Sequence, residues 1–293
     1  MIYLAVAAFA ILRGIYVVVT KLTQKNYVNS FEDSIYLTML FSLIQAVFLP
    51  LMPPYTDYNF EAGMLFNPIL FAVFFSASFI LYITALRYGS NSLTNTVTGF
   101  SLLVPILVGL VLWNEVITLY QIIGLLLFSV IIFLFNRSTF VAGTEARPVT
   151  LRWMVIAIAS AAANGTCVIF TKQHMIHYSG AIKEYLLILN AAIFILSLPY
   201  LLWAYRRKKF KPTLNRRFII YGGITALIQN INNIIYMVYI NSFKSTSFFP
   251  MVGIINIISA VAVSRLILKE RMSKLAYAGI VLSFVSIYLL NAK

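Results

Sequence analysis

The 293-residue sequence is 61% hydrophobic and 10% charged, and it carries a net charge of +14. A soluble domain has roughly 25% charged residues, so the composition excludes a soluble globular protein and predicts an integral membrane protein. The basic residues are spread over many short segments, which argues against a nucleic-acid-binding module. The single cysteine, Cys167, excludes a disulfide framework or a cysteine metal site within the chain.

Ten apolar runs follow one another along the chain, each long enough to cross a bilayer. A helix satisfies its backbone hydrogen bonds internally, so each run predicts a transmembrane helix. The sequence starts directly in the first run, without a basic segment or a cleavage site, and this run is interpreted as a helix rather than a signal peptide. The runs cover residues 2–20, 34–52, 66–86, 93–113, 117–136, 153–171, 184–204, 218–241, 245–264 and 275–291.

The distribution of Lys and Arg predicts the orientation. Most of the 22 basic residues lie in odd-numbered loops, above all in 206–217 and 265–274. Even-numbered loops hold only Lys172, Lys183 and Lys244. The positive-inside rule therefore puts the odd-numbered loops in the cytoplasm and both termini outside.

The two halves of the sequence share residues with matching order and spacing. The matches are Arg13-Gly14 with Asn164-Gly165, Thr20-Lys21 with Thr171-Lys172, and Glu115, Gly124 and Asn136 with Glu270, Gly279 and Asn291. Residues 1–145 and 146–293 are therefore predicted to be two five-helix repeats. Five is an odd number, so the second repeat would enter the membrane upside down. The predicted fold is an all-α integral membrane protein of ten transmembrane helices in two inverted repeats, as in many secondary transporters.

Over essentially the whole chain these residues resemble the EamA family of the drug/metabolite transporter superfamily. That family typically opens each repeat with a Trp-Gly pair followed by Lys, and Gly14 with Lys21 and Gly165 with Lys172 fit its spacing. The family also tends to carry a Gly-Glu or Lys-Glu pair between the fourth and fifth helices and a Gly in the fifth. Asn114-Glu115 with Gly124, and Lys269-Glu270 with Gly279, resemble these elements. The chain departs from the family at the Trp position, which is Arg13 in one repeat and Asn164 in the other.

The resemblance implies a multi-pass carrier in the plasma membrane, the inner membrane in a bacterium. Such carriers move small metabolites, amino acids or drugs through a central cavity that opens alternately to each side. Lys21 and Lys172 are equivalent residues on opposite faces and are predicted to lie at the two mouths of the cavity. The alternative is that both are lysines at helix ends whose head groups snorkel to the interface.

Arg13 is the most informative side chain, because it lies near the middle of the first apolar run. A charge at the bilayer centre costs several kcal/mol and normally faces a cavity or a partner. No Asp or Glu occurs within the core of any run to pair with it. Arg13 is therefore either a cation that binds a carboxylate or phosphate, or a structural residue capped by backbone carbonyls. A cation in the first helix disfavours cationic drugs, which the small multidrug exporters of this superfamily bind through a Glu there.

The eighth run is rich in amides. Gln229, Asn232, Asn233 and Tyr236 have i, i+3, i+4, i+7 spacing and share one face, here called the amide stripe. Intramembrane amides either tie helices together or line a polar pathway, and four polar groups on one face favour the pathway. The other predicted substrate-binding residues are Tyr82, Ser101, Asn164, Asn190 and Asn256.

Other candidates favour simpler interpretations. His174 and His177 are expected in a loop, and two histidines without a third ligand do not predict a metal site. Glu115 and Glu270 are expected in very short loops, where a turn or a helix cap accounts for them. No cofactor is expected.

The function that follows is secondary transport, not enzymatic catalysis. The expected substrate is a small polar metabolite, most plausibly an amino acid or another carboxylate, moved by alternating access in export or exchange. The protein would act in the lipid bilayer as a monomer or homodimer. The alternatives are a membrane-embedded enzyme and a non-transporting scaffold; drugs or nucleoside-type metabolites are the alternative substrates.

Overall fold

The computed structural model describes residues 8–16, 19–20, 23, 30–52, 58–88, 94, 97–138, 150–207, 216–266 and 274–292. Within these ranges the chain is helical and contains no strand. Residues 8–16 are helical. The later elements are α2 (Phe31–Phe48), η1 (Leu49–Leu51), η2 (Ala62–Leu65), α3 (Phe66–Tyr88), η3 (Phe100–Leu102), α5 (Leu103–Leu112), α6 (Leu119–Ser138), α7 (Leu151–His177), α8 (Ile182–Arg206), α9 (Arg216–Ile240), α10 (Ser245–Leu266) and α11 (Lys274–Asn291).

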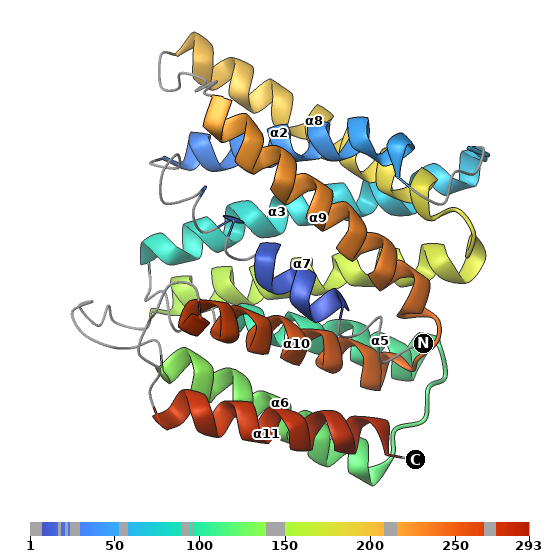
Figure 1. Cartoon of the computed structure of the whole chain (residues 1–293), viewed down its shortest axis with the longest axis vertical. Coiled ribbons are helices and arrows are strands. Elements are labelled where there is room, and N and C mark those ends of the chain that lie inside the picture. Colours follow the sequence, from blue (N-terminus) through green and yellow to red (C-terminus); the bar gives the residue numbers. More distant parts are fainter. Residues whose placement is uncertain are drawn as a thin grey trace. The chain divides into compact units, whose positions relative to one another are not determined.

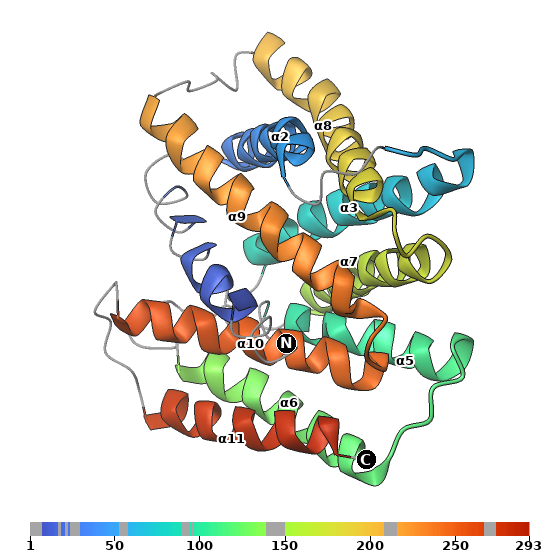
Figure 2. The ribbon, with the colours of Figure 1, turned by 45° about the vertical axis from the view of Figure 1, so that its right-hand side comes forward.

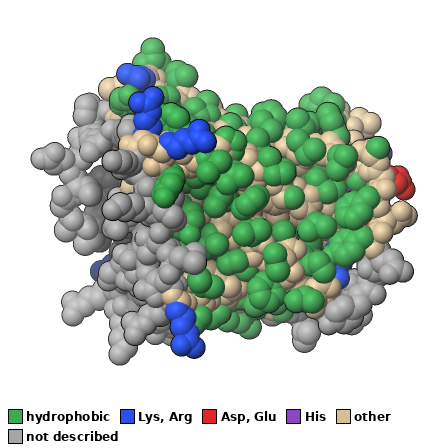
Figure 3. Space-filling view, turned by 90° about the horizontal axis from the view of Figure 1, so that it is seen from above, with side chains coloured by type: hydrophobic (Ala, Val, Ile, Leu, Met, Phe, Trp, Pro, Cys, Tyr) green, Lys and Arg blue, Asp and Glu red, His purple; other side chains and the backbone are tan. Residues whose placement is uncertain are grey.

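Several helices have the length and surface of membrane spans. Five stretches in the described ranges are long and apolar enough: Phe31–Leu51, Ala62–Leu86, Leu151–His177, Ile182–Arg206 and Phe218–Ile240. At most a third of the most apolar window of each is buried inside the protein. Figure 3 shows a broad hydrophobic face with most of the visible Lys and Arg at one margin. The all-helical prediction is confirmed, and these exposed apolar helices are consistent with a membrane protein.

The chain forms two compact units, and each takes segments from both halves of the sequence. Unit 1 consists of Met1–Ser76 and Phe170–Asn241, and unit 2 of Ala77–Ile169 and Ser242–Lys293. The helices α3 and α7 contribute to both units. A compact unit is defined by contacts and a repeat by matched positions, so the repeats 1–145 and 146–293 stay a prediction.

In unit 1, α2 packs against α8 and α9 (Figure 1). It begins with a capping box, in which the Ser30 hydroxyl accepts the Asp33 N–H and the Asp33 carboxylate accepts the Ser30 N–H. The Asn230 side chain, in the middle of α9, donates to the backbone carbonyl of Gln45, in the last turn of α2, at 3.0 Å. This amide ties two helices together.

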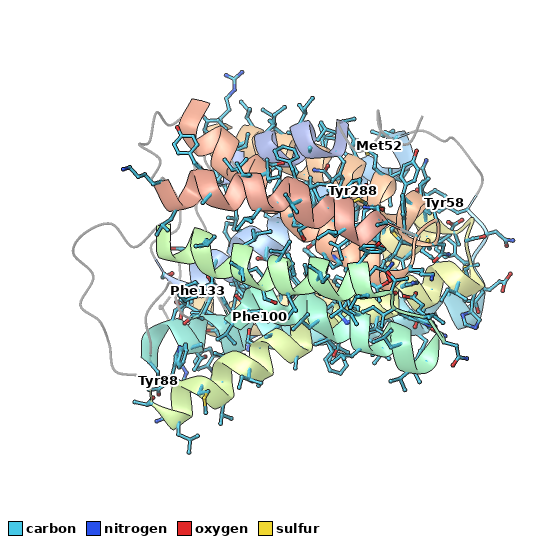
Figure 4. The ribbon with its side chains drawn as sticks, turned by 90° about the horizontal axis from the view of Figure 1, so that it is seen from below. Met52, Tyr58, Tyr88, Phe100, Phe133 and Tyr288 are labelled. Carbon is cyan, nitrogen blue, oxygen red and sulfur yellow. The ribbon has the colours of Figure 1, made fainter. Side chains whose placement is uncertain are left out.

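The ends of unit 1 show that α2 and α8 run in opposite directions. At one end the Tyr200 hydroxyl, near the end of α8, donates to Glu32 at the start of α2 at 3.3 Å. At the other end Lys183 donates to the carbonyl of Met52, and Glu184 accepts the Asn59 N–H at 3.0 Å. Met52 and the neighbouring Tyr58 are on the same side of the view in Figure 4. The start of each of these two helices therefore lies beside the end of the other.

In unit 2, α6 and α11 lie side by side (Figures 1 and 2) and α10 packs against both. Phe128, Ile131, Ile254 and Leu290 are part of their buried core. Gly124 permits the close approach, because a Cβ there would lie 2.9 Å from the Cγ of Leu290. The Ser286 hydroxyl also donates to the Gly124 carbonyl at 2.8 Å. The glycine matched between the repeats thus has a packing role in the first one.

One predicted boundary is wrong. Helix α7 continues to His177 instead of ending near residue 171, so His174 and His177 lie in its last turns and not in a loop. The hydropathy falls at Lys172 because the side chains become polar, but the backbone hydrogen bonds continue. The Tyr178 N–H donates to the His174 carbonyl at 2.7 Å.

Candidate functional site

The predicted site residues are divided between the two units. Unit 1 holds Arg13, Lys172, Asn190, Gln229, Asn232, Asn233 and Tyr236, and unit 2 holds Tyr82, Ser101, Asn164 and Asn256. Lys21 lies outside the described residues.

Arg13 is joined to the amide stripe by hydrogen bonds. Its Nη1 donates to Oε1 of Gln229 at 3.1 Å, and Nε2 of Gln229 donates to Oδ1 of Asn233 at 2.9 Å. We call these three residues the donor chain. Gln229 is the central residue of the span Phe218–Ile240, so the guanidinium group is bound at the middle of that helix.

The permanent charge of Arg13 determines the orientation of both amides. A guanidinium group donates and never accepts, so Gln229 must present its oxygen to Arg13. Its nitrogen then faces Asn233, which must in turn present an oxygen. The Nδ2 of Asn233 is left as a donor at the end of the chain. Within the described structure the Nε of Arg13 is also without a hydrogen-bond partner. The free polar groups of the donor chain are therefore donors, an arrangement suited to an anion.

Tyr16 completes the surroundings of Arg13 and was not predicted. The Cζ of Arg13 lies 4.8 Å from the centroid of the Tyr16 ring, a cation–π contact. The signal was the i, i+3 spacing of the two residues in the first apolar run.

Two neighbouring amides of α9 have different roles. Asn232 is 1% exposed, and neither its Oδ1 nor its Nδ2 has a partner among the described residues. Asn230 is 0% exposed; its nitrogen donates to the Gln45 carbonyl, and its Oδ1 has no partner among the described residues. Buried polar atoms are normally hydrogen-bonded, so Asn232 has the capacity to bind a ligand or water, whereas Asn230 holds α9 to α2. Asn190 is not brought into the donor chain: its Nδ2 donates to the Leu186 carbonyl of its own helix at 2.8 Å.

In unit 2, the predicted residues mostly join helices. The Nδ2 of Asn164 donates to the Ser101 hydroxyl at 3.0 Å. The adjacent Gly165 is needed for this approach, because a Cβ there would lie 2.3 Å from the Ser101 carbonyl oxygen. Ser78 and Ser160 each donate to the other's backbone carbonyl at 3.0 Å. The structure places Tyr82 half-buried on α3, and Asn256 on α10 has a buried oxygen without a partner among the described residues.

Lys172 differs from a snorkelling lysine, because its side chain is 5% exposed. It lies in a buried polar region at the end of α7. There the hydroxyls of Thr171 and Tyr185 are hydrogen-bonded at 2.8 Å, and the His174 ring lies 4.7 Å from the Tyr185 ring. His177 is exposed and contacts the Gln173 carbonyl of its own helix through Nδ1, at 2.9 Å.

Glu115 caps a helix, as one interpretation of the sequence had it. Its carboxylate accepts the Ser245 N–H at 2.7 Å and the Ser245 hydroxyl at 2.9 Å, at the start of α10. A carboxylate at a helix N-terminus is stabilised by unpaired N–H groups and by the helix dipole. Asn114 before it has a φ of 49°, a left-handed conformation that Asn tolerates and that Gly adopts freely.

Comparisons with known proteins support the fold alone. No family model matches the sequence, and no curated protein matches it. A solved structure described only as the crystal structure of a protein aligns with 98% of this chain and 95% of its own, with a TM-score of 0.71. The two sequences are 13% identical, so the likeness concerns the path of the chain and not its activity.

Proposed function

We propose that this chain is a secondary carrier that moves a small metabolite with a carboxylate or another anionic group by alternating access. The donor chain is the observation that carries the proposal. Its guanidinium group and its terminal amide nitrogen offer donors at the centre of a membrane span. An ionised residue at that depth is costly and by default serves a ligand or ion pathway.

The architecture that we propose for this carrier is ten transmembrane helices in two inverted five-helix repeats, as in the EamA family. The matched residues of the two halves support the repeat, and the pairing of helix ends in each unit supports alternating spans. In such carriers the substrate site lies near the bilayer midplane, and Gln229, which binds Arg13, is the central residue of the candidate span Phe218–Ile240. The plasma membrane is the proposed location.

Each member of the site has a distinct role in this proposal. Arg13 binds the anionic group of the substrate, and the nitrogen of Asn233 adds a second hydrogen bond. Gln229 is a positioning residue, because both of its polar atoms are used within the donor chain. Asn232 contributes a buried donor and acceptor to the polar part of the substrate. Tyr16 holds the guanidinium plane in place.

Counterflow in proteoliposomes tests the proposal. Proteoliposomes that contain the protein are loaded with unlabelled amino acids, monocarboxylates, phosphate or nucleosides. Uptake of the same compound in labelled form is then measured. We expect saturable counterflow for at least one carboxylate. Arg13→Gln should lower its kcat/KM about a hundredfold, since a charged hydrogen bond at a site screened from water contributes about 1.5–3 kcal/mol.

The matched control is Asn241→Ala. Asn241 follows α9, off the stripe, and donates to the Met175 carbonyl at 2.6 Å. This variant removes an amide of unit 1 without touching the donor chain and should keep counterflow. Counterflow with nucleosides but with no carboxylate or phosphate would refute the assignment of an anionic substrate.

A further inference from the structure

The charge of Arg13 is uncompensated in the described structure. The groups that contact its guanidinium there are the amide oxygen of Gln229 and the ring of Tyr16, and both are neutral. None of the acidic residues of the sequence lies in the core of an apolar run. A guanidinium group carries a full positive charge, and its N–H groups only donate. The empty site therefore keeps one full positive charge at the middle of a membrane span.

This charge makes the empty and loaded carriers electrostatically different. When a carrier changes its facing, it passes through a state in which the site is closed to water on both sides. An unpaired charge is strongly disfavoured in such a place, whereas an ion pair that is also hydrogen-bonded is tolerated. A bound monoanion would neutralise the site, and the free donors of Arg13 and Asn233 would bond it.

We infer that the protein is an obligatory exchanger of monoanions. The binding site changes the side to which it opens when a monoanion is bound, and it does not do so when it is empty. The inference rests on the proposed function and adds the mode of transport and the net charge of the substrate. A zwitterionic amino acid has no net charge and would leave the site cationic, so it should support slow exchange at best. A monocarboxylate is the substrate class that fits.

Two rates measured on the wild-type protein test the inference. Proteoliposomes are loaded with labelled pyruvate, 3-hydroxybutyrate or N-acetylglycine. Efflux is then followed into buffer that contains either the same unlabelled compound or none. We expect efflux with external substrate to be about a hundredfold faster, because an Arg at the bilayer centre disfavours passage by about two factors of ten. Exchange of one monoanion for another should also be unaffected by a potassium diffusion potential.

The outcomes separate the inference from the proposed function. Saturable efflux at the same rate with and without external substrate would overturn obligatory exchange and leave a carrier of anions. Exchange that responds to the potential would also overturn it, because the loaded site would then carry net charge. If none of the anions gives saturable flux, the proposed function and the inference both fail.

Variants at Arg13 link the ratio of the two rates to the charge. Arg13→Lys keeps the charge and should keep a large ratio at saturating substrate. Arg13→Gln removes the charge, so its ratio should fall towards one even though both fluxes are lower. Arg152→Gln is the matched control. Arg152 lies at the start of α7 in unit 2 with its Cζ 4.3 Å from the centroid of the Tyr88 ring (Figure 4), and its loss should leave the ratio unchanged. A ratio near a hundred in Arg13→Gln would contradict the inference.

Discussion

Units 1 and 2 use intramembrane polar side chains in different ways. In unit 2, pairs such as Ser78 with Ser160, and Asn164 with Ser101, bind one helical segment to another. In unit 1, the described structure leaves the Nε of Arg13 and both polar atoms of Asn232 without partners. Polar groups that form hydrogen bonds with each other stabilise a fold. Buried polar groups without hydrogen-bond partners lower stability and are free to bind a ligand. In unit 2 these pairs hold helical segments together. In unit 1 the proposed function assigns Arg13 and Asn232 to ligand binding, while Asn230 holds α9 to α2.

The largest expected effect on unfolding free energy comes from a substitution that disrupts the close packing of unit 2. Gly165→Ala places a Cβ 2.3 Å from the Ser101 carbonyl oxygen, so the backbone must shift. We expect a loss of about 2–3 kcal/mol in unfolding free energy, measured by thermal or denaturant unfolding in detergent. The control is Gly223→Ala in α9, where a Cβ would have no described atom within 4 Å. That variant should be neutral or slightly stabilising; equal losses in both would refute the packing argument.

The second effect concerns the helix cap of unit 2. Glu115→Ala removes the acceptor for the Ser245 N–H and hydroxyl at the start of α10. We expect the unfolding free energy to fall by about 2 kcal/mol, because hydrogen bonds to a charged group are lost at a helix N-terminus. Glu115→Gln should recover part of it. Unchanged counterflow per folded molecule would agree with a structural role, and a selective loss of flux at normal stability would contradict it.

The third effect compares two buried amides of unit 1. Asn232→Leu removes two polar atoms that have no partner among the described residues, and it should raise the unfolding free energy by about 1–2 kcal/mol. Asn230→Leu removes one such atom, Oδ1, but it also breaks the bond to Gln45, so it should not stabilise the protein. The expected cost of Asn232→Leu is functional: a smaller stabilisation by a saturating monocarboxylate in a thermal-shift assay. Destabilisation by both variants would show that Asn232 also has a structural role.

The smallest effect sharpens the role of the turn before Glu115. Asn114 has a φ of 49°, so Asn114→Gly should preserve stability or raise it slightly, and Asn114→Ala should cost about 1 kcal/mol. The two variants are compared by the midpoint of thermal unfolding. If Asn114→Ala and the wild type had the same midpoint of thermal unfolding, the left-handed conformation at this position would not affect stability.

The apolar runs of the sequence predicted an all-helical protein, and five candidate membrane spans lie in the described ranges. The end of α7 was misplaced because hydropathy follows the side chains and not the backbone. Periodicity put Gln229 and Asn233 on one face. It did not reveal that Arg13 contacts them, since a period describes one helix and not its neighbour. The sequence also ranked Asn232 and Asn190 equally as candidate site residues. In the structure Asn190 donates to a carbonyl of its own helix α8, whereas Asn232 has no partner among the described residues. The helix cap of Glu115 was foreseen as one interpretation, but its partner Ser245, 130 residues away, was not.

The donor chain also has an evolutionary consequence. The Gln229 amide links Arg13 to Asn233, because its oxygen accepts from Arg13 and its nitrogen donates to Asn233. Glutamine and glutamate codons differ by a single base, so one mutation could place a carboxylate against Arg13 and cancel the charge of the empty site. Under the proposed function, this single change would shift the preferred substrate from an anion to a neutral or zwitterionic molecule. A saturation library at position 229, selected on a zwitterionic amino acid, should enrich Glu; enrichment of other residues alone would refute this path.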